Sequence, residues 1–190
     1  MFDRLVHNWV YGGFLAGLAL LALYPLLAEH WSEPLRLTFL FLPIYIVHQY
    51  EEHDADRFRL FFNRTIGGGR EVLKPAAVFI INIFGVWGVI VAACYLSANV
   101  NPGFGLIAVY LAVVNAVVHA VHAIAFRGYN PGLATALVLF IPLGAYSIMR
   151  FDALGAGGLA WQATGLGVAI SIHAAIIAYA LRRRAALAAT

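Results

Sequence analysis

The chain has 190 residues, of which 63% are hydrophobic and only 11% are charged. Soluble domains carry about 25% charged residues, so this composition excludes a soluble globular protein and indicates one integral membrane bundle. A net charge of +3, with the basic residues placed between apolar segments, does not form a nucleic-acid-binding surface. The single cysteine, Cys94, excludes a disulfide framework.

Six apolar segments reach or approach the roughly 20 residues that a membrane-spanning helix needs. We expect an all-α transmembrane bundle, forming a single domain over residues 1–190, with helices at about 9–28, 35–50, 76–97, 104–126, 132–149 and 161–181. The second segment is short, so its helix is expected to continue into the polar residues that follow. Residues 57–70 alternate arginine with large apolar residues, which is typical of a short amphipathic piece at the membrane surface.

The basic residues are divided unevenly between the two ends of these six helices. Ten of the twelve Lys and Arg residues lie before the first helix, after the second, after the fourth or after the sixth. Only Arg36 and Arg150 lie in the other set of connections. Since Lys and Arg mark cytoplasmic segments, we expect both termini in the cytoplasm.

A polar motif stands at the end of the second helix, with the sequence His48-Gln49-Tyr50-Glu51-Glu52-His53. At 100° per residue, His48, Glu51 and Glu52 fall within an arc of roughly 100° on one helix face. Ionisable groups near lipid are costly and usually face the bundle interior, where they mark functional sites. His53 points to another face, and we expect it to form a solvated cytoplasmic rim with the two aspartates that follow.

Further polar groups are expected at the same depth on other helices. Asn115, His119 and His122 lie within an arc of roughly 60° on the fourth helix, and His173 lies on the sixth. At 1.5 Å per residue, His48, His119 and His173 all lie ~12–13 Å from the next arginine. Imidazole and carboxylate groups on several helices are how bundles hold divalent metals such as iron or zinc. The expected metal ligands are His48, Glu51, Glu52, His119, His122 and His173.

Two of these polar residues are also catalytic candidates. Glu52 is expected as a bridging ligand or a general base, while Glu51 faces inward below His48 as a metal ligand. Asn115 would be a weak ligand or the group that orients His119.

The pattern His48-x-x-Glu51-Glu52, followed by Asn115-x-x-x-His119, resembles the HXXEE domain family. The segment Arg127-Gly128-Tyr129-Asn130-Pro131-Gly132 is also similar to that family, and the resemblance covers roughly residues 35–150. It implies a small bacterial membrane protein, suspected to be an enzyme because its polar motifs lie in the membrane. It implies no substrate. The expected location is therefore a bacterial inner membrane.

Several functions are compatible with these residues. The first is a metal-dependent enzyme acting on a lipid-like or apolar small molecule, with membrane lipid around it and no nucleic-acid partner. A redox form would use two irons and O₂, and a hydrolytic form would use zinc with Glu51 or Glu52 as base.

The alternatives use the same residues differently. A haem-binding electron carrier would take His119 or His122 and His173 as axial ligands. A transporter would pass protons along the His and Glu groups. The motif could also be an interfacial cap, with its glutamates paired to Arg57 or Arg59, and the histidines could serve only as hydrogen bonds between helices.

Overall fold

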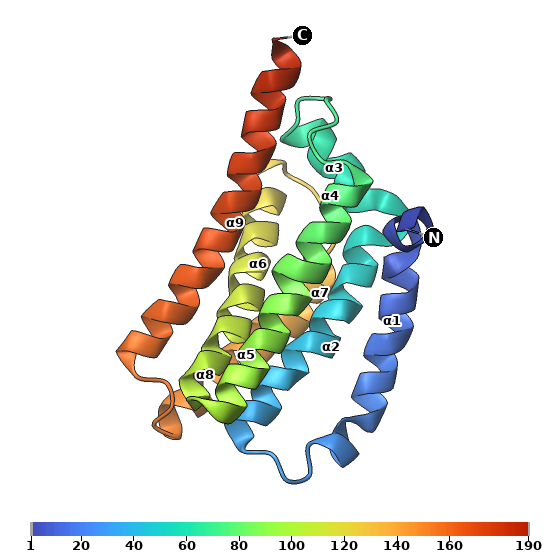
Figure 1. The fold of residues 1–190 in the computed structure, drawn as a ribbon. Coiled ribbons are helices and arrows are strands. Elements are labelled where there is room, and N and C mark those ends of the chain that lie inside the picture. The colour runs from blue at the N-terminus through green and yellow to red at the C-terminus, as the bar shows by residue number, and fades with distance from the viewer. Residues whose placement is uncertain (1, 190) are drawn as a thin grey trace.

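The structure, a computed structural model, describes residues 2–189 and is all-α over that range. Its helical elements form six rods that run up and down the bundle (Figure 1). Their bounds are α1 Phe2–Leu27, α2 Glu33–His53, η1 Asp54–Asp56, α3 Arg57–Thr65, α4 Pro75–Ile80, η2 Ile81–Trp87, α5 Gly88–Asn99, η3 Pro102–Gly105, α6 Leu106–Ala125, α7 Leu133–Thr135, η4 Ala136–Phe140, α8 Ile141–Ala153 and α9 Leu159–Ala188.

Five of the six rods are long and apolar enough to cross a membrane, and they cover Phe2–Leu27, Pro75–Asn99, Pro102–Ala125, Leu133–Ala153 and Leu159–Ala188. The remaining rod is α2, which has a comparable length of 21 residues but carries charged residues near both of its ends. The expected all-α bundle of six helices is confirmed. The start of α1 and the end of α9 lie at the same end of the bundle, beside α3 (Figure 1). Which side of the membrane this end faces is still given only by the charge distribution.

Helix α1 packs closely on α2 because two of its buried residues, Gly13 and Gly17, have no side chain. A Cβ atom at Gly17 would lie 2.8 Å from the side chain of Ile46, and one at Gly13 would lie 2.9 Å from Trp87. Small residues four apart let helix backbones approach in a membrane, where the hydrophobic effect does not drive helix association. Helix α2 therefore lies directly against α1 on one side while it also contacts α5 and α6.

Two segments of the bundle are wound as π-helix, which is rare and often found at functional sites. The first, η2, carries Asn82, whose Oδ1 accepts a hydrogen bond of 2.7 Å from Gln49 on α2. Gln49 in turn accepts a hydrogen bond from the indole N–H of Trp87. The second, η4, ends two residues before Pro142, which lacks the N–H that a regular helical turn would use. Both π segments lie against the inner part of α2.

Helix α3 and the segment after it cover one end of the bundle. Phe62, Val72, Leu73 and Val78 are buried together there with Ala180 of α9. The side chain of Asn63 holds the segment in place, since its amide donates to the carbonyl oxygen of Leu73 and its Oδ1 accepts from Leu73 N–H, both at 2.9 Å. We call α3 and residues 66–74 the roof. The amphipathic piece predicted at residues 57–70 corresponds to this roof.

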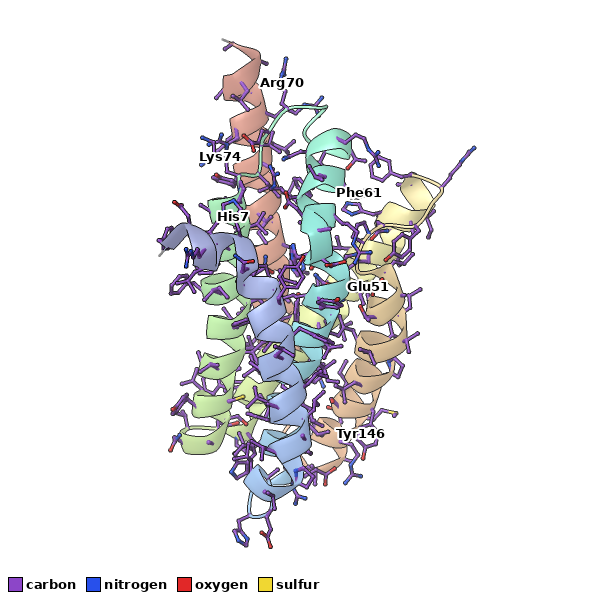
Figure 2. The ribbon with its side chains drawn as sticks, turned by 90° about the vertical axis from the view of Figure 1, so that its right-hand side faces the viewer. His7, Glu51, Phe61, Arg70, Lys74 and Tyr146 are labelled. Atoms are coloured by element: carbon purple, nitrogen blue, oxygen red, sulfur yellow. The ribbon has the colours of Figure 1, made fainter. Side chains whose placement is uncertain are left out.

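The roof end of the bundle is the basic end. Figure 2 shows Arg70 and Lys74 at this end and Tyr146 toward the opposite end. At that opposite end, Arg150 donates hydrogen bonds of 2.6 and 2.9 Å to Glu33, and Arg36 donates one of 2.9 Å to the carbonyl oxygen of Trp31. Both basic residues predicted on the outer side are therefore held by intramolecular hydrogen bonds.

Candidate metal centre

Three buried side chains from two helices meet in the inner part of the bundle. His48 and Glu52 lie one turn apart on α2, and His119 lies on the facing side of α6. Glu52 Oε2 lies 3.5 Å from His48 Nε2, and Glu52 Oε1 lies 3.5 Å from His119 Nε2. One ligand atom from each of the three residues lies within 4.8 Å of the other two. We call these three residues the triad.

The protonation of His48 follows from its hydrogen-bond partner. Its Nδ1 lies 2.9 Å from the hydroxyl oxygen of Thr135, and that hydroxyl donates its own proton to Glu51. The hydroxyl oxygen must therefore accept from His48 Nδ1–H. The neutral ring then carries its lone pair on Nε2, which is buried, faces Glu52 and has no hydrogen-bond partner.

His119 is held in the same way by a different residue. Its Nδ1 lies 2.6 Å from Asn130 Oδ1, and the amide nitrogen of Asn130 donates to the carbonyl oxygen of His119 at 2.9 Å. The second bond fixes the orientation of the amide, so Oδ1 is the acceptor and Nδ1 the donor. The lone pair of His119 is then also on Nε2, toward Glu52. A hydrogen bond on the far nitrogen is the usual support of a metal-binding histidine.

The triad is arranged as a set of acceptors around a common point. Two imidazole lone pairs face one carboxylate, and hydrogen bonds between charged partners would be about 2.7–2.9 Å long, shorter than the 3.5 Å found. Ligand atoms held ~2.0–2.2 Å from a tetrahedral metal lie roughly 3.3–3.6 Å apart. Each separation is of that size, although the two end on different oxygens of Glu52, and one ligand atom from each residue lies within 4.8 Å of the other two. The triad could therefore hold one metal ion.

Glu51 lies outside the triad, which differs from the expectation that it would be a metal ligand. Its carboxylate accepts hydrogen bonds from Tyr129 at 2.6 Å, from the backbone N–H groups of Ala134 and Thr135 at 3.1 and 2.7 Å, and from the Thr135 hydroxyl. Burial and the bond to Glu51 together raise the pKa of Tyr129. Glu51 thus anchors residues 128–135, which we call the clamp loop.

The clamp loop holds both histidines of the triad. Thr135 bonds His48 and Asn130 bonds His119, so the loop fixes the two Nδ1 atoms at once. Between them lies Gly132, whose φ of +95° suits glycine. A Cβ atom there would lie 2.7 Å from His119 Cε1 and 2.8 Å from His48 Cε1. The backbone at Gly132 therefore touches both imidazoles, and only glycine leaves room for them.

A cavity of about 100 Å³ lies beside the triad. Its wall is mostly apolar, and its polar lining residues are Glu52, His53, Asn82, Asn115, His119, His122 and His173. The Oδ1 atom of Asn115 is buried and has no hydrogen-bond partner. The roof closes the cavity from above, because Phe58, Phe62 and Leu73 also line it.

The structure places His122 and His173 at the cavity but not among the triad. His122 packs near the rings of Phe61 and Phe126, with centroids 6.4 and 5.9 Å away. His173 donates from Nδ1 to the carbonyl oxygen of Ala169, one turn earlier on α9, at 2.8 Å. Both are partly buried, so they are available to contact a molecule in the cavity.

His53 is not part of a solvated rim, and that expectation is wrong. It is only 6% exposed, because Trp9 of α1 and Phe58 of α3 pack on its ring with centroids 5.1 and 5.2 Å away. Its Nε2 lies 3.1 Å from Glu52 Oε2. His53 is thus a further buried histidine at the carboxylate of Glu52, and it contacts Oε2, the oxygen that His48 also approaches. Asp54, by contrast, is partly exposed and pairs with Arg57, as expected of a rim.

Sequence reasoning missed the residues of the clamp loop. Asn130 and Gly132 lie in the segment that is similar to the HXXEE family but had no predicted part in the site, and Thr135 lies in the apolar helix expected at 132–149. The available signal was the Asn130-Pro131-Gly132 string, which joins a polar side chain to a residue that tolerates positive φ.

The comparison with protein families agrees with this geometry. The model of a family described as "Protein of unknown function with HXXEE motif" matches residues 39–147. The chain belongs to this family. The HXXEE motif corresponds to His48, Glu51 and Glu52, so it supplies two residues of the triad and the anchor of the clamp loop. His119 and Asn130 also lie within the matched region. No curated protein and no solved structure matches the chain.

Proposed function

We propose that this HXXEE protein is a membrane enzyme that uses one divalent metal ion, bound by His48, Glu52 and His119, to act on a lipid-like or apolar small molecule. The observation that carries the proposal is the protonation pattern of the two histidines. The clamp loop occupies both Nδ1 atoms, which leaves two Nε2 lone pairs directed at one carboxylate. A cation is the partner that such an arrangement lacks.

The surroundings support one ion rather than two. Two-metal carboxylate sites in bundles draw on a glutamate from each of several helices. Among residues 2–189, the triad is the group of three or more His, Cys, Asp or Glu side chains close enough to share an ion. Glu51, the nearest further carboxylate in sequence, already accepts four hydrogen bonds from the clamp loop.

Two histidines and one carboxylate suit both metals expected from the sequence. Bound iron(II) would supply reaction with O₂ at its open positions, whereas bound zinc would supply an activated water. The iron oxidoreductase is the better fit, because the cavity wall is mostly apolar and Glu52, as a ligand, is not free to act as a base. The zinc hydrolase is the second candidate, and His122 and His173 at the cavity favour it as alternative bases.

The protein's own residues have defined parts in this proposal. The clamp loop orients the two imidazoles, and His53 holds the carboxylate of Glu52. The roof excludes water from the cytoplasmic end of the cavity. The buried Oδ1 atom of Asn115 adds an acceptor without a partner to the cavity lining.

The other functions fit the geometry less well. A cavity of about 100 Å³ is smaller than the 150 Å³ cavity that encloses one benzene molecule, so it does not admit a porphyrin. In a proton-relay transporter, the histidines would exchange protons at both ring nitrogens. Here the Nδ1–H of each triad histidine is instead held in a hydrogen bond to the clamp loop.

Metal content of the purified protein tests the proposal. We expect close to one equivalent of iron or zinc in the unmodified protein and little in His48→Ala, Glu52→Gln and His119→Ala. His30→Ala is the matched control, because His30 is exposed, and it should keep its metal. Full metal retention in all three triad variants would refute the proposed site. An absorption spectrum of the same samples with an intense Soret band would support the haem alternative instead.

A further inference from the structure

The elements that line the cavity beside the triad enclose it unevenly. Its lining residues on α2 are all buried, and the roof covers its upper end. Its four lining residues on α9, by contrast, are all partly exposed, and they are Ile172, His173, Ile176 and Ile177. The lining residues of α6, η2 and the roof combine partly exposed side chains, such as Val118, Ile81 and Phe58, with buried ones, so α9 is the lining element without a buried residue. The least enclosed side of the cavity is therefore the side formed by α9.

Helix packing explains why the opening lies there. Helix α9 packs along α6, and near the roof Ile177 and Ala180 join the apolar cluster that includes Val78 and Ile81. Figure 1 shows α9 at the edge of the bundle. Ile172 and Ile176 of α9 line the same cavity as Val86 of η2. We call this opening between α9 and η2 the side window.

The side window faces the place where lipid would be. The neighbouring outward residues Phe84 and Ile170 are large, apolar and 67% and 52% exposed. Both lie in segments long and apolar enough to cross a membrane. The cavity lining combines apolar side chains of α9 and η2, such as Ile172, Ile176 and Val86, with Glu52 and His119 of the triad.

We propose that the side window admits a single-chain hydrocarbon molecule dissolved in the bilayer, which enters chain end first and stops beside the triad. The inference rests on the proposed function in taking the cavity as the substrate site. A volume of about 100 Å³ holds only the last few carbons of a chain. His119 lies six residues, or ~9 Å of helix, before Ala125 at the end of α6, so only the apolar part of such a molecule reaches the triad.

Photolabelling of the full-length protein in lipid nanodiscs tests this. The probe is a palmitic acid analogue with a diazirine on its terminal carbon, and the comparison is the same acid with the diazirine next to the carboxylate. We expect the terminal probe to label residues of the cavity wall, such as Ile172 and Val86, at least five times more than the comparison probe. Equal labelling by both probes, or labelling confined to outward residues such as Phe84 and Ile170, would overturn the proposal.

Two substitutions on α9 sharpen the test. Ile176→Trp fills the window and should reduce labelling of the cavity wall at least fivefold. Ile170→Trp adds the same bulk to the exposed face of the same helix and should leave labelling unchanged. Metal content, measured on each sample, reports folding and separates the two proposals. Cavity labelling in a protein without metal would count against the proposed function alone, whereas bound metal without cavity labelling would overturn the side window alone.

Discussion

At the scale of single residues, the adjacent glutamates of the HXXEE motif have different parts. Glu52 faces the two histidine Nε2 atoms, and Glu51 binds the clamp loop. The link between them is Thr135, whose hydroxyl contacts both His48 and Glu51. The first and last residues of the motif, His48 and Glu52, thus belong to the triad that could hold a metal ion, and the middle one, Glu51, positions the clamp loop.

The hydroxyl of Thr135 can be tested by near-isosteric substitution. Thr135→Val keeps the volume but removes the acceptor of His48 Nδ1–H, and loss of such an outer contact weakens metal binding by about 10–100-fold. Thr135→Ser keeps the hydroxyl and should retain most of the affinity. Competition with a chelating dye of known affinity measures both. Equal affinities in the Val and Ser variants would show that the hydroxyl does not orient His48.

Gly132 allows backbone strain to be separated from steric clash. Gly132→Ala places a Cβ atom against both imidazoles at a φ of +95°, and we expect loss of metal binding together with lower thermal stability. Gly69→Ala is the control, because Gly69 also has a positive φ, of +82°, but nothing within 4 Å of its Cβ position. Gly69→Ala should cost about 1 kcal/mol from strain and leave metal content unchanged. Metal loss in both variants would mean that general destabilisation, not contact with the histidines, is responsible.

How far the sequence predicts the site is clearest for these residues. Helical spacing placed His48, Glu51 and Glu52 on one face, and shared depth brought His119 to the same layer. Spacing could not show whether Glu51 or Glu52 belongs to the triad, because residues three and four positions after His48 both lie about one helical turn away. That choice depends on a loop more than 75 residues away in the sequence, as the Tyr129–Glu51 contact shows. His53 was misjudged because its burial comes from Trp9 on another helix.

At the scale of elements, the roof depends on one side chain. Asn63 makes two hydrogen bonds to the backbone of Leu73, and both are buried. The sequence predicted residues 57–70, which include Asn63, only as an amphipathic piece at the membrane surface. Amphipathic patterning indicates an apolar face but does not say what that face covers. Here the face covers the cavity, through Phe58 and Phe62.

Removing the Asn63 side chain should loosen the roof. Asn63→Ala leaves a buried N–H and a buried carbonyl of Leu73 without partners, at a cost of about 2 kcal/mol. We expect faster hydrogen–deuterium exchange over residues 66–74 and unchanged exchange within α6. Asn99→Ala, which removes an exposed bond within α5, should leave the roof unaffected. Unchanged exchange over 66–74 in Asn63→Ala would show that apolar packing alone holds the roof.

At the scale of the whole molecule, the bundle has six long helical segments, an even number, and the start of α1 and the end of α9 lie at one end (Figure 1). The helix count and approximate bounds were predictable because apolar length is a strong signal in membrane proteins. The π segments η2 and η4 were not, since they depend on how neighbouring helices accommodate Asn82 and Pro142.

Reporter fusions test the orientation of this bundle. Because basic residues gather at the roof end, fusions at Asn101 and Ala156, in connections at the opposite end, should report the outer side of the membrane. A fusion after Arg184 should report the cytoplasm. A cytoplasmic signal from Asn101 or Ala156 would reverse or break the proposed topology.

The position of a bound metal tests the account most directly. Crystals of protein loaded with iron(II) or zinc should show, at the absorption edge of that metal, one anomalous peak ~2.0–2.2 Å from His48 Nε2, His119 Nε2 and a Glu52 oxygen. A single peak at another place, such as between His122 and His173, would contradict the account. So would a protein that binds one equivalent of metal while the triad shows no peak.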